Sequence, residues 1–266
     1  MKPQRFAVVG DPVAHSKSPL MHRAAFRALG LPHSYEALHV TTEELPGVVQ
    51  ALREGRYDGL NVTLPHKEAA LALADDRAAG DLRAANTLVR THNGRVVAHN
   101  TDVPALAEEL RLLGGAGAAW TTRRALVLGS GGAALAALSA LRALGVRDVA
   151  VRARTLRSPA TEAWAPSRDR EARTLAVVQA TSAGMIGADR GEVAVEAVAW
   201  DALSGDALAL DVVYAPPETP FLVAARRRGL RCANGLGMLA RQGALAFELW
   251  LGIPAPFEVM RAALET

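Results

Sequence analysis

The chain contains a single cysteine, Cys232, and aromatic residues make up only 5% of its 266 residues. One cysteine excludes an internal disulfide and favours a reducing compartment. No apolar run approaches the length that spans a bilayer, and the N-terminal residues MKPQRFAVVGDP lack the hydrophobic region of a signal peptide. We therefore expect a soluble, cytoplasmic protein whose core consists mainly of Ala, Val and Leu.

Lysine is scarce as well, because the basic residues are 27 arginines and only three lysines, Lys2, Lys17 and Lys67. The net charge is +3, and the arginines are scattered apart from the triplet 226–228. This distribution lacks the basic stripe that indicates nucleic-acid binding. The triplet precedes Gly229 and is typical of the C-terminal end of a helix.

Lys67 stands out among the three lysines. It closely follows Pro65, so we expect it in the first turn of a helix, where the macrodipole disfavours a cation. A compact, titratable ammonium at such a position indicates a chemical role. The alternative is a solvated surface charge.

Strand and helix patterns alternate along the chain, which predicts an α/β fold with mostly parallel sheets. In the first part, strand patterns at 5–10, 33–40, 59–63, 86–90 and 95–100 alternate with helical patterns at 19–29, 45–55 and 67–74. After a helix at about 104–113, the glycine-rich stretch GGAGAAWTTR is typical of a domain boundary. The pattern then restarts at 124, with later strands at 148–154, 174–181 and 207–214 and an apolar helix at 236–252.

The restart contains a glycine turn. In LVLGSGGAAL, Gly129, Gly131 and Ala134 have the G-x-G-x-x-G/A spacing between a strand and a helix. Such glycines let a pyrophosphate approach the helix N-terminus, so the turn favours a dinucleotide site. The alternative is a tight turn that binds nothing.

Basic residues follow the next predicted strand, at the point where dinucleotide sites distinguish their cofactors. An acidic residue there favours NAD, whereas arginine accommodates the 2′-phosphate of NADP. This chain has Arg152, Arg154, Thr155 and Arg157, and no acid before Glu162. The residues therefore favour NADP, although solvated surface arginines remain an alternative.

Polar side chains concentrate at the strand ends of the first half, where open α/β sheets bind ligands. Three of the five asparagines are there. Amides and hydroxyls with one lysine and one aspartate suit a small polyhydroxylated ligand. A structural interpretation also exists, since Ser18 and Asp102 stand where helix N-caps are expected. The residues concerned are Ser16, Ser18, Asn61, Thr63, Lys67, Asn86, Thr87, Asn100, Thr101 and Asp102.

The segments GDPVAHSKSP, GLNVTLPHK, NTL, HNTD, GSGGA, TSAGM, DVVYAPPETPFL and NGLGMLARQGALAFELW resemble, in this order, the motifs of shikimate dehydrogenases over nearly the whole chain. The resemblance implies two α/β domains around a cleft. Residues 1–102 would bind the substrate, residues 103–235 would form a Rossmann-like NADP-binding domain, and residues 236–266 would return to the substrate domain. It also implies the reversible NADPH-dependent reduction of 3-dehydroshikimate to shikimate, a step of chorismate and aromatic amino acid biosynthesis, by a monomer or homodimer without a metal.

The same resemblance assigns roles to individual residues. Lys67 and Asp102 would form the catalytic pair, because a lysine can deliver a proton to the developing alkoxide and arginine could hardly release one. The substrate-binding residues would be Ser16, Ser18, Asn61, Thr63, Asn86, Tyr214 and Gln242. The cofactor-binding residues would be Gly129, Ser130, Gly131, Gly132, Ala133, Arg152, Arg154, Thr155, Arg157, Thr181, Met185, Val212 and Gly235.

Three positions depart from the family pattern. Arg83 replaces a glycine before Asn86, and Ala153 and Gln179 replace asparagines in the cofactor half. The last two changes predict weaker NADP binding than the substrate half suggests. The alternatives are a quinate/shikimate dehydrogenase with broader substrate or NAD use, a non-catalytic NADP- or metabolite-binding homologue, and a purely structural α/β protein.

Overall fold

The computed structural model of the chain describes residues 2–79, 82–154 and 161–265. The chain divides into two compact units. Unit 1 comprises the residues up to Asp102 together with those from Leu239 onward, and unit 2 comprises Val103–Met238. Each unit contains its own sheet of six strands.

Unit 1 is built on a mixed sheet with the strand order β2-β1-β3-β5-β6-β4. β1 pairs in parallel with both β2 and β3, whereas β5 is antiparallel to β3 and β6. A turn containing Gly94, whose φ is +82°, connects β5 to β6. The strands are β1 (Arg5–Gly10), β2 (Ser34–His39), β3 (Gly59–Val62), β4 (Asp76–Arg77), β5 (Thr87–Arg90) and β6 (Val96–His99).

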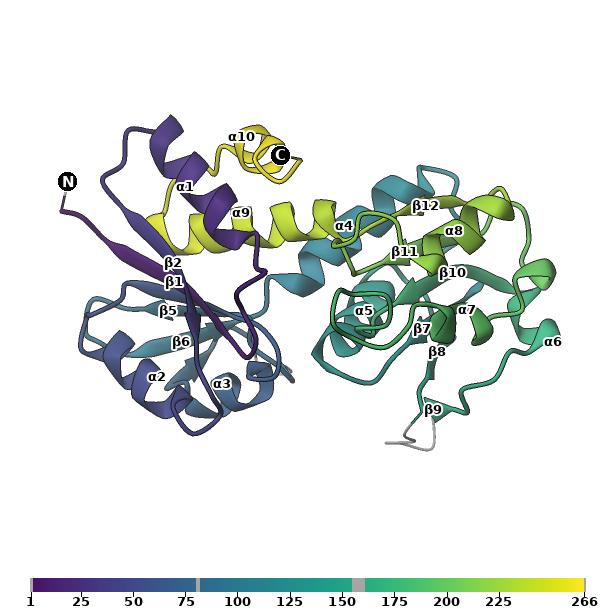
Figure 1. Cartoon of the computed structure of the whole chain (residues 1–266), viewed down its shortest axis with the longest axis horizontal. Coiled ribbons are helices and arrows are strands. Elements are labelled where there is room, and N and C mark those ends of the chain that lie inside the picture. Colours follow the sequence, from purple (N-terminus) through teal and green to yellow (C-terminus); the bar gives the residue numbers. More distant parts are fainter. Residues whose placement is uncertain (1, 80–81, 155–160, 266) are drawn as a thin grey trace. The chain divides into compact units, whose positions relative to one another are not determined.

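Helices cover both faces of this sheet (Figure 1), with α1 and α9 on one face and α2 and α3 on the other. Since side chains alternate along a strand, Phe6 and Tyr35 point to the α1/α9 face, whereas Ala7 and Val9 point to the aliphatic core beside α2. The helices are α1 (Ser18–Ala28), α2 (Leu45–Arg53), α3 (Lys67–Leu73), α9 (Leu236–Leu251) and α10 (Phe257–Ala262).

Unit 2 has a wholly parallel sheet with the strand order β12-β11-β10-β7-β8-β9. This is a doubly wound arrangement. From β7 the following strands, β8 and β9, are added outward on one side, and from β10 the strands β11 and β12 are added outward on the other side. The strands are β7 (Arg124–Leu128), β8 (Val149–Arg152), β9 (Thr161–Glu162), β10 (Thr174–Gln179), β11 (Leu208–Asp211) and β12 (Arg231–Ala233). The helices are α4 (Asp102–Gly114), α5 (Gly132–Ala143), α6 (Arg168–Glu171), α7 (Glu192–Glu196), a 3-10 turn η1 (Trp200–Ala202) and α8 (Pro220–Arg227).

Two hydrophobic cores, both rich in alanine, pack against the sheet of unit 2. One includes Leu106, Leu141 and Val127, and the other includes Leu126, Phe221 and Leu222. Alanine contributes much of both cores, so helices can approach the sheet closely. Each fully buried large aliphatic side chain contributes about 1.5–3 kcal/mol to folding.

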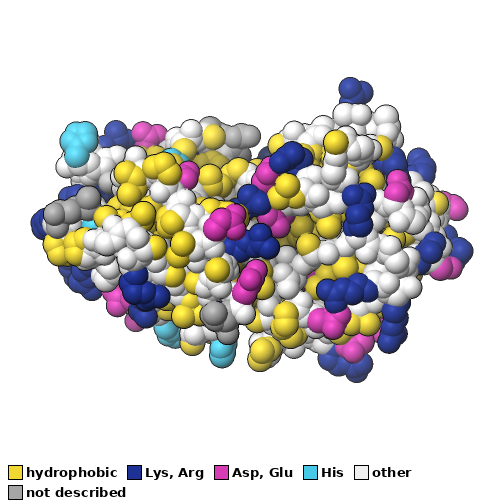
Figure 2. Space-filling view, turned by 90° about the horizontal axis from the view of Figure 1, so that it is seen from above, with side chains coloured by type: hydrophobic (Ala, Val, Ile, Leu, Met, Phe, Trp, Pro, Cys, Tyr) yellow, Lys and Arg dark blue, Asp and Glu magenta, His cyan; other side chains and the backbone are white. Residues whose placement is uncertain are grey.

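The predicted α/β class and the mostly parallel sheets are confirmed. The arginine triplet at 226–228 does mark a helix end, since α8 ends at Arg227 and Gly229 has a φ of +76°. Basic and acidic side chains are interspersed over the face drawn in Figure 2. The short strands β4, β9 and β12, the helices α6, α7 and α10, and the start of α8 lacked a pattern strong enough to predict their bounds.

Candidate active site

Lys67 is the first residue of α3, as its position after Pro65 predicted. Its Nζ donates to Oδ2 of Asp102 at 2.6 Å, and the two side chains are 14% and 6% exposed. The Lys67 carbonyl accepts a hydrogen bond from the backbone N–H of Ala85 at 2.9 Å, which fixes the start of α3 against the segment before β5. The ammonium therefore has a defined position at the surface of unit 1.

Asp102 is buried at the point where the chain leaves β6 and begins α4. Its second carboxylate oxygen, Oδ1, accepts a hydrogen bond from Nδ2 of Asn86 at 2.8 Å. Its backbone N–H donates to Oδ1 of Asn100 at 3.0 Å, and Asn100 in turn donates to the carbonyl of Ala84 at 2.9 Å. Each carboxylate oxygen thus has a donor, which offsets the desolvation of the charge.

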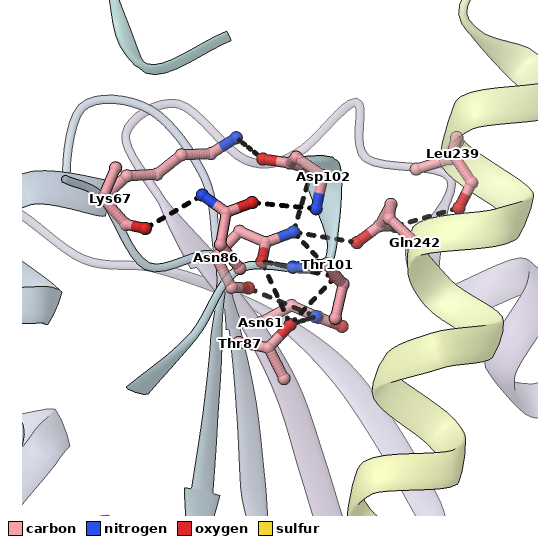
Figure 3. A network of polar contacts seen from close by, with 10 residues as sticks. Asn61, Lys67, Asn86, Thr87, Thr101, Asp102, Leu239 and Gln242 are labelled. Carbon is pink, nitrogen blue, oxygen red and sulfur yellow. Dashed lines mark hydrogen bonds and ion pairs between the residues drawn. The ribbon is translucent and has the colours of Figure 1, made fainter. Parts of the chain in front are cut away.

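Asn86 is the hub of the network in Figure 3, immediately before β5. Its Nδ2 lies within hydrogen-bond reach of Oγ1 of Thr101 at 2.9 Å, Oδ1 of Asp102 at 2.8 Å and Oε1 of Gln242 at 3.4 Å. Its Oδ1 accepts from the backbone N–H of Thr101 at 2.7 Å. The Asn86 amide therefore has partners from the ends of two strands and from α9.

Gln242 comes from α9, far along the chain. Its Nε2 donates to the carbonyl of Leu239 at 2.9 Å, which leaves Oε1 directed towards Asn86. The adjacent Gly243 lets α9 approach α1, because a Cβ there would lie 2.2 Å from Cε of Met21. The close helix packing brings Gln242 to the network.

Asn61 lies within β3, and Thr63 is the first residue after this strand. Nδ2 of Asn61 donates to Oγ1 of Thr87 at 3.1 Å, and Oδ1 accepts from the hydroxyl of Tyr35 at 2.7 Å. Thr63 is half-buried, and its backbone N–H donates to the carbonyl of Val9 at 2.9 Å. Asn61 therefore belongs to the same network as Asn86, whereas Thr63 lies at its margin.

Ser16 and Ser18 precede and begin α1. The backbone N–H of Ser18 donates to Oγ of Ser16 at 3.3 Å, so the Ser16 hydroxyl proton remains available to another acceptor. Between the two serines, Nζ of Lys17 donates to the carbonyl of Leu264 at 2.8 Å, beyond the end of α10. This hydrogen bond connects the loop that carries Ser16 and Ser18 to the C-terminal segment of unit 1.

This arrangement suits acid–base chemistry on a hydroxylated molecule. Lys67 offers an acidic proton at a partly exposed position, and Asp102 holds the ammonium in place. The surrounding amides and hydroxyls supply both donors and acceptors. Such a group contributes about 10²–10⁴-fold to a rate when it transfers a proton in the transition state.

Tyr214 is the one predicted substrate residue that lies in unit 2, on the segment after β11. Asp211 ends β11 and organises this segment. Its carboxylate accepts from the Thr219 hydroxyl at 2.6 Å and from the backbone N–H of Val213 at 2.9 Å. Burial raises the pKa of Asp211 to about 6, and the two hydrogen bonds oppose that rise.

The predicted glycine turn lies between β7 and α5. Gly129 has a φ of +118°, and a Cβ there would lie 2.8 Å from the carbonyl oxygen of Ala180. Gly131 is the N-cap residue of α5, Gly132 is its first residue, and Ser130 and Ala133 are half-buried beside them. Only glycine fits at position 129, because the end of β7 lies directly against the backbone that follows β10.

Four further predicted cofactor residues, Thr181, Met185, Val212 and Gly235, lie on segments that follow β10, β11 and β12. Thr181 is half-buried after β10, and Met185 is 41% exposed on the same segment. Gly235 follows β12 and packs on Val212, because a Cβ at 235 would lie 2.1 Å from the Val212 carbonyl oxygen. These segments and the glycine turn all follow the carboxyl ends of parallel strands, which meet at one edge of the sheet.

The position of Arg152 does not fit the cofactor-binding role that the sequence analysis predicted for it. Its side chain is 1% exposed and forms ion pairs with Glu171 at 2.8 Å and Glu162 at 3.0 Å. Its Nη1 also donates to the carbonyl of Ala197. The guanidinium thus neutralises acids inside unit 2 and is not available to a ribose phosphate.

Arg154 remains as the candidate arginine of this segment within the described residues. It is exposed and pairs with Asp189 at 2.8 Å. The predicted residues Thr155 and Arg157 lie outside the described residues.

The three departures from the family pattern have distinct local settings. Gln179 is buried, its Oε1 accepts from the Thr181 backbone N–H at 2.6 Å, and its Nε2 donates to the Ala183 carbonyl at 3.0 Å. It therefore shapes the segment after β10. Arg83 is exposed, and Ala153 is buried at 3% exposure. Among the described residues only glycines have a positive φ. The backbone at Arg83 therefore lies outside the positive-φ region and does not require a glycine.

Among residues 2–79, 82–154 and 161–265, no cluster of His, Cys, Asp and Glu has an arrangement that could hold a metal ion. Within the same ranges, every helix is too short or too polar to cross a membrane. Sequence reasoning missed two buried residues beside the network, Tyr35 and His22, because both lie in ordinary strand and helix patterns. The scarcity of tyrosine, with only three in the chain, was the one available signal.

Two family models match the chain. The model described as "Shikimate dehydrogenase substrate binding domain" matches residues 8–88, which extend from within β1 to the start of β5. The model described as "Shikimate 5'-dehydrogenase C-terminal domain" matches residues 235–265, which include α9 and α10.

Full-length relatives are similar over almost the whole chain. A shikimate dehydrogenase (NADP(+)) from Methylobacterium radiotolerans is 44% identical over 95% of this chain and 92% of the relative. The crystal structure of shikimate 5-dehydrogenase from Thermus thermophilus in complex with NADP(H) and shikimate is 36% identical, covers 98% of both chains and has a TM-score of 0.83. A quinate dehydrogenase from Corynebacterium glutamicum in complex with NAD is 28% identical, covers 98% of this chain and 99% of that chain, and has a TM-score of 0.82.

Proposed function

The chain belongs to the shikimate dehydrogenase family, and on that premise we propose that Lys67 and Asp102 are the catalytic pair of an NADP-dependent enzyme that interconverts 3-dehydroshikimate and shikimate. The observation that carries this proposal is the 2.6 Å contact between Lys67 Nζ and Asp102 Oδ2 inside a network of amides and hydroxyls. Membership of the family supports both the reaction and the cofactor.

The chemistry divides between the cofactor and the chain. When bound, NADPH supplies the hydride for reduction of a ring ketone. Lys67 stabilises the oxygen on which negative charge develops and delivers a proton to it. In the opposite direction the neutral amine of Lys67 accepts the proton of the substrate hydroxyl. Asp102 holds the lysine side chain at the reacting oxygen in both directions, and arginine could not replace the lysine as an acid.

We propose that the polar residues of unit 1 bind the substrate at its two ends. Ser16 and Ser18 hold the carboxylate, since the Ser16 hydroxyl proton is not used by its contact with Ser18. The ring hydroxyls contact the amides and hydroxyls of Asn61, Thr63, Asn86 and Gln242, and we also assign Tyr214 to substrate binding. Buried amides suit this task because a ligand that lacks a hydroxyl leaves them unpaired.

The residues of unit 2 fit a dinucleotide. Gly129 and Gly235 allow close packing of the backbone, and Gly131, the N-cap residue of α5, has open space where a Cβ would stand, which leaves the first N–H groups of the helix uncovered. Backbone N–H groups at a helix start favour a pyrophosphate. Arg154 is the described arginine that we assign to the 2′-phosphate, together with Thr155 and Arg157. We also propose that unit 1 is the substrate-binding domain and unit 2 the NADP-binding domain, in a cytoplasmic protein.

A single substitution tests the catalytic assignment. Lys67→Ala should lower kcat by about 10²–10⁴-fold in a 340 nm assay with shikimate and NADP. NADPH binding, followed by fluorescence, and the far-UV circular dichroism spectrum should be unchanged. Lys67→Arg is the matched control for charge, and it should stay slow because its proton is held too firmly.

The opposite results separate the alternatives. A Lys67→Ala enzyme with wild-type kcat would refute the catalytic role of Lys67. Assays of the wild type with quinate and with NAD distinguish a quinate/shikimate dehydrogenase from the proposed enzyme. Shikimate binding without any absorbance change at 340 nm would identify a non-catalytic homologue.

A further inference from the structure

Tyr35 is a buried tyrosine that none of the roles above includes. It lies on β2 at 1% exposure, and its hydroxyl is 2.7 Å from Oδ1 of Asn61. Asn61 is on β3, so the tyrosine side chain reaches over β1, the strand between them. The register places both side chains on the α1/α9 face of the sheet, because Tyr35 pairs with Phe6 and Asn61 pairs with Val8.

The direction of this hydrogen bond is fixed by the protonation of the phenol. Burial raises the pKa of Tyr35 well above its ordinary value, and a hydrogen bond with the Ser18 side chain acts in the opposite direction. The phenol therefore keeps its proton and donates it to the Asn61 carbonyl oxygen.

The other end of the Asn61 amide is fixed as well. Nδ2 of Asn61 lies 3.3 Å from the backbone carbonyl of Asn86, which can only accept, and 3.1 Å from Oγ1 of Thr87. With a donor at Oδ1 and an obligate acceptor at Nδ2, the amide has a single orientation. Both N–H protons of Asn61 are then used within the protein, and the second lone pair of Oδ1 faces a known direction.

His22 fixes the position of the tyrosine ring. The two rings stack with centroids 4.2 Å apart and an interplanar angle of 6°. Burial lowers the pKa of His22 to about 3, so the imidazole is neutral, and both ring nitrogens lack a hydrogen-bond partner among the described residues. The contribution of His22 is therefore the shape of its ring, which limits the rotation of Tyr35.

We propose that Tyr35 is a positioning residue for the substrate, acting through Asn61. The proposal rests on the function above, in which Asn61 contacts a ring hydroxyl. Tyr35 orients the Asn61 amide before the substrate arrives, so that the remaining acceptor lone pair of Asn61 Oδ1 is presented to a ring hydroxyl without a rearrangement. The tyrosine hydroxyl donates to the Asn61 amide, so the effect of Tyr35 on the substrate passes through that amide.

The test is Tyr35→Phe, which removes one oxygen and keeps the ring against His22. We expect KM for shikimate to rise about 5- to 20-fold, the range of a lost neutral hydrogen bond that leaves a buried acceptor unpaired. kcat and KM for NADP should change less than twofold, because Lys67 and unit 2 are untouched. Tyr57→Phe is the matched control, since its hydroxyl contacts Glu36 at 3.4 Å and is partly exposed. It should leave KM unchanged.

A double-mutant cycle with Asn61→Ala identifies the route of the effect. If Tyr35 acts through Asn61, the double variant should have the KM of Asn61→Ala alone, because the tyrosine then has no amide to orient. Multiplying effects, or an unchanged KM in Tyr35→Phe, would overturn the positioning role while leaving the proposed function intact. An unchanged KM in Asn61→Ala would instead remove Asn61 from the substrate site, and the inference about Tyr35 with it.

Discussion

Lowering the pH should destabilise unit 1 through one buried histidine, His22. Its pKa is lowered from 6.5 to about 3 by burial. In the unfolded chain the imidazole takes up a proton as the pH falls below 6.5, whereas the folded state excludes that proton until about pH 3. The stability that His22 contributes is therefore fully present above pH 6.5 and is lost progressively as the pH falls towards 3.

The magnitude follows from this difference in proton binding. Each pH unit below 6.5 costs about 1.4 kcal/mol, so the loss at pH 5 is about 2 kcal/mol relative to neutral pH. Asp211 acts in the opposite direction, because its pKa of about 6 lies above the ordinary carboxyl value and its protonation favours the folded state. Asp211 belongs to unit 2, so a probe confined to unit 1 separates the two effects.

The perturbation is His22→Phe, which keeps an aromatic ring beside Tyr35 and removes the titratable group. Of the four tryptophans, only Trp250 lies in unit 1, so replacing Trp120, Trp164 and Trp200 by Phe gives a fluorescence signal from that unit. Urea unfolding at pH 7.5 and at pH 5 then yields the free energy of unfolding for both versions of residue 22.

We expect the wild-type residue to lose about 2 kcal/mol more than Phe between these two pH values. The absolute stability of His22→Phe is irrelevant, since a larger ring also strains the contact with α9. Equal losses in the two proteins would refute the reasoning, because they would mean that His22 has the same proton affinity folded and unfolded.

Three further predictions concern other parts of the chain. Gly243→Ala should destabilise unit 1 by about 1–3 kcal/mol through its clash with Met21, whereas Gly47→Ala at an exposed position of α2 should not destabilise it, as urea unfolding can measure. Glu171→Gln should destabilise unit 2 by about 3–5 kcal/mol, because it leaves a buried arginine without one of its two carboxylates; an unchanged unfolding midpoint would contradict this. Arg154→Ala should raise KM for NADP about 10- to 100-fold and leave KM for NAD unchanged, and equal rises for both cofactors would exclude a phosphate contact.

The sequence allowed much of unit 1 to be predicted because its polar residues stand at strand ends. Asn61, Asn86 and Asp102 are separated along the chain, but a sheet brings the ends of neighbouring strands together. The contact between Lys67 and Asp102 is therefore a consequence of topology. Its 2.6 Å length needed the structure, since strand patterns do not give the depth at which a side chain lies.

Arg152 shows where such reasoning fails. A basic residue at the end of β8 was assigned to the cofactor from its position along the chain alone. The alternation of the strand provides the correction, because Arg152 shares a face with the buried Ala150 and so points inward. Tyr35 was not predicted, because an aromatic residue inside a strand is ordinary. Only its hydrogen bond to Asn61 distinguishes it.

The contact between Lys17 and the Leu264 carbonyl has a consequence for the order in which the protein can be made. Unit 1 combines the first and last segments of the chain, so a ribosome must synthesise all of unit 2 before the partner of Lys17 exists. At ordinary elongation rates this interval is on the order of 10 seconds. During it, β1 to β6 lack α9 and α10, while unit 2 can already fold. Loss of only a few residues from the end of the chain would leave every proposed catalytic residue in place but would release the loop that carries Ser16 and Ser18.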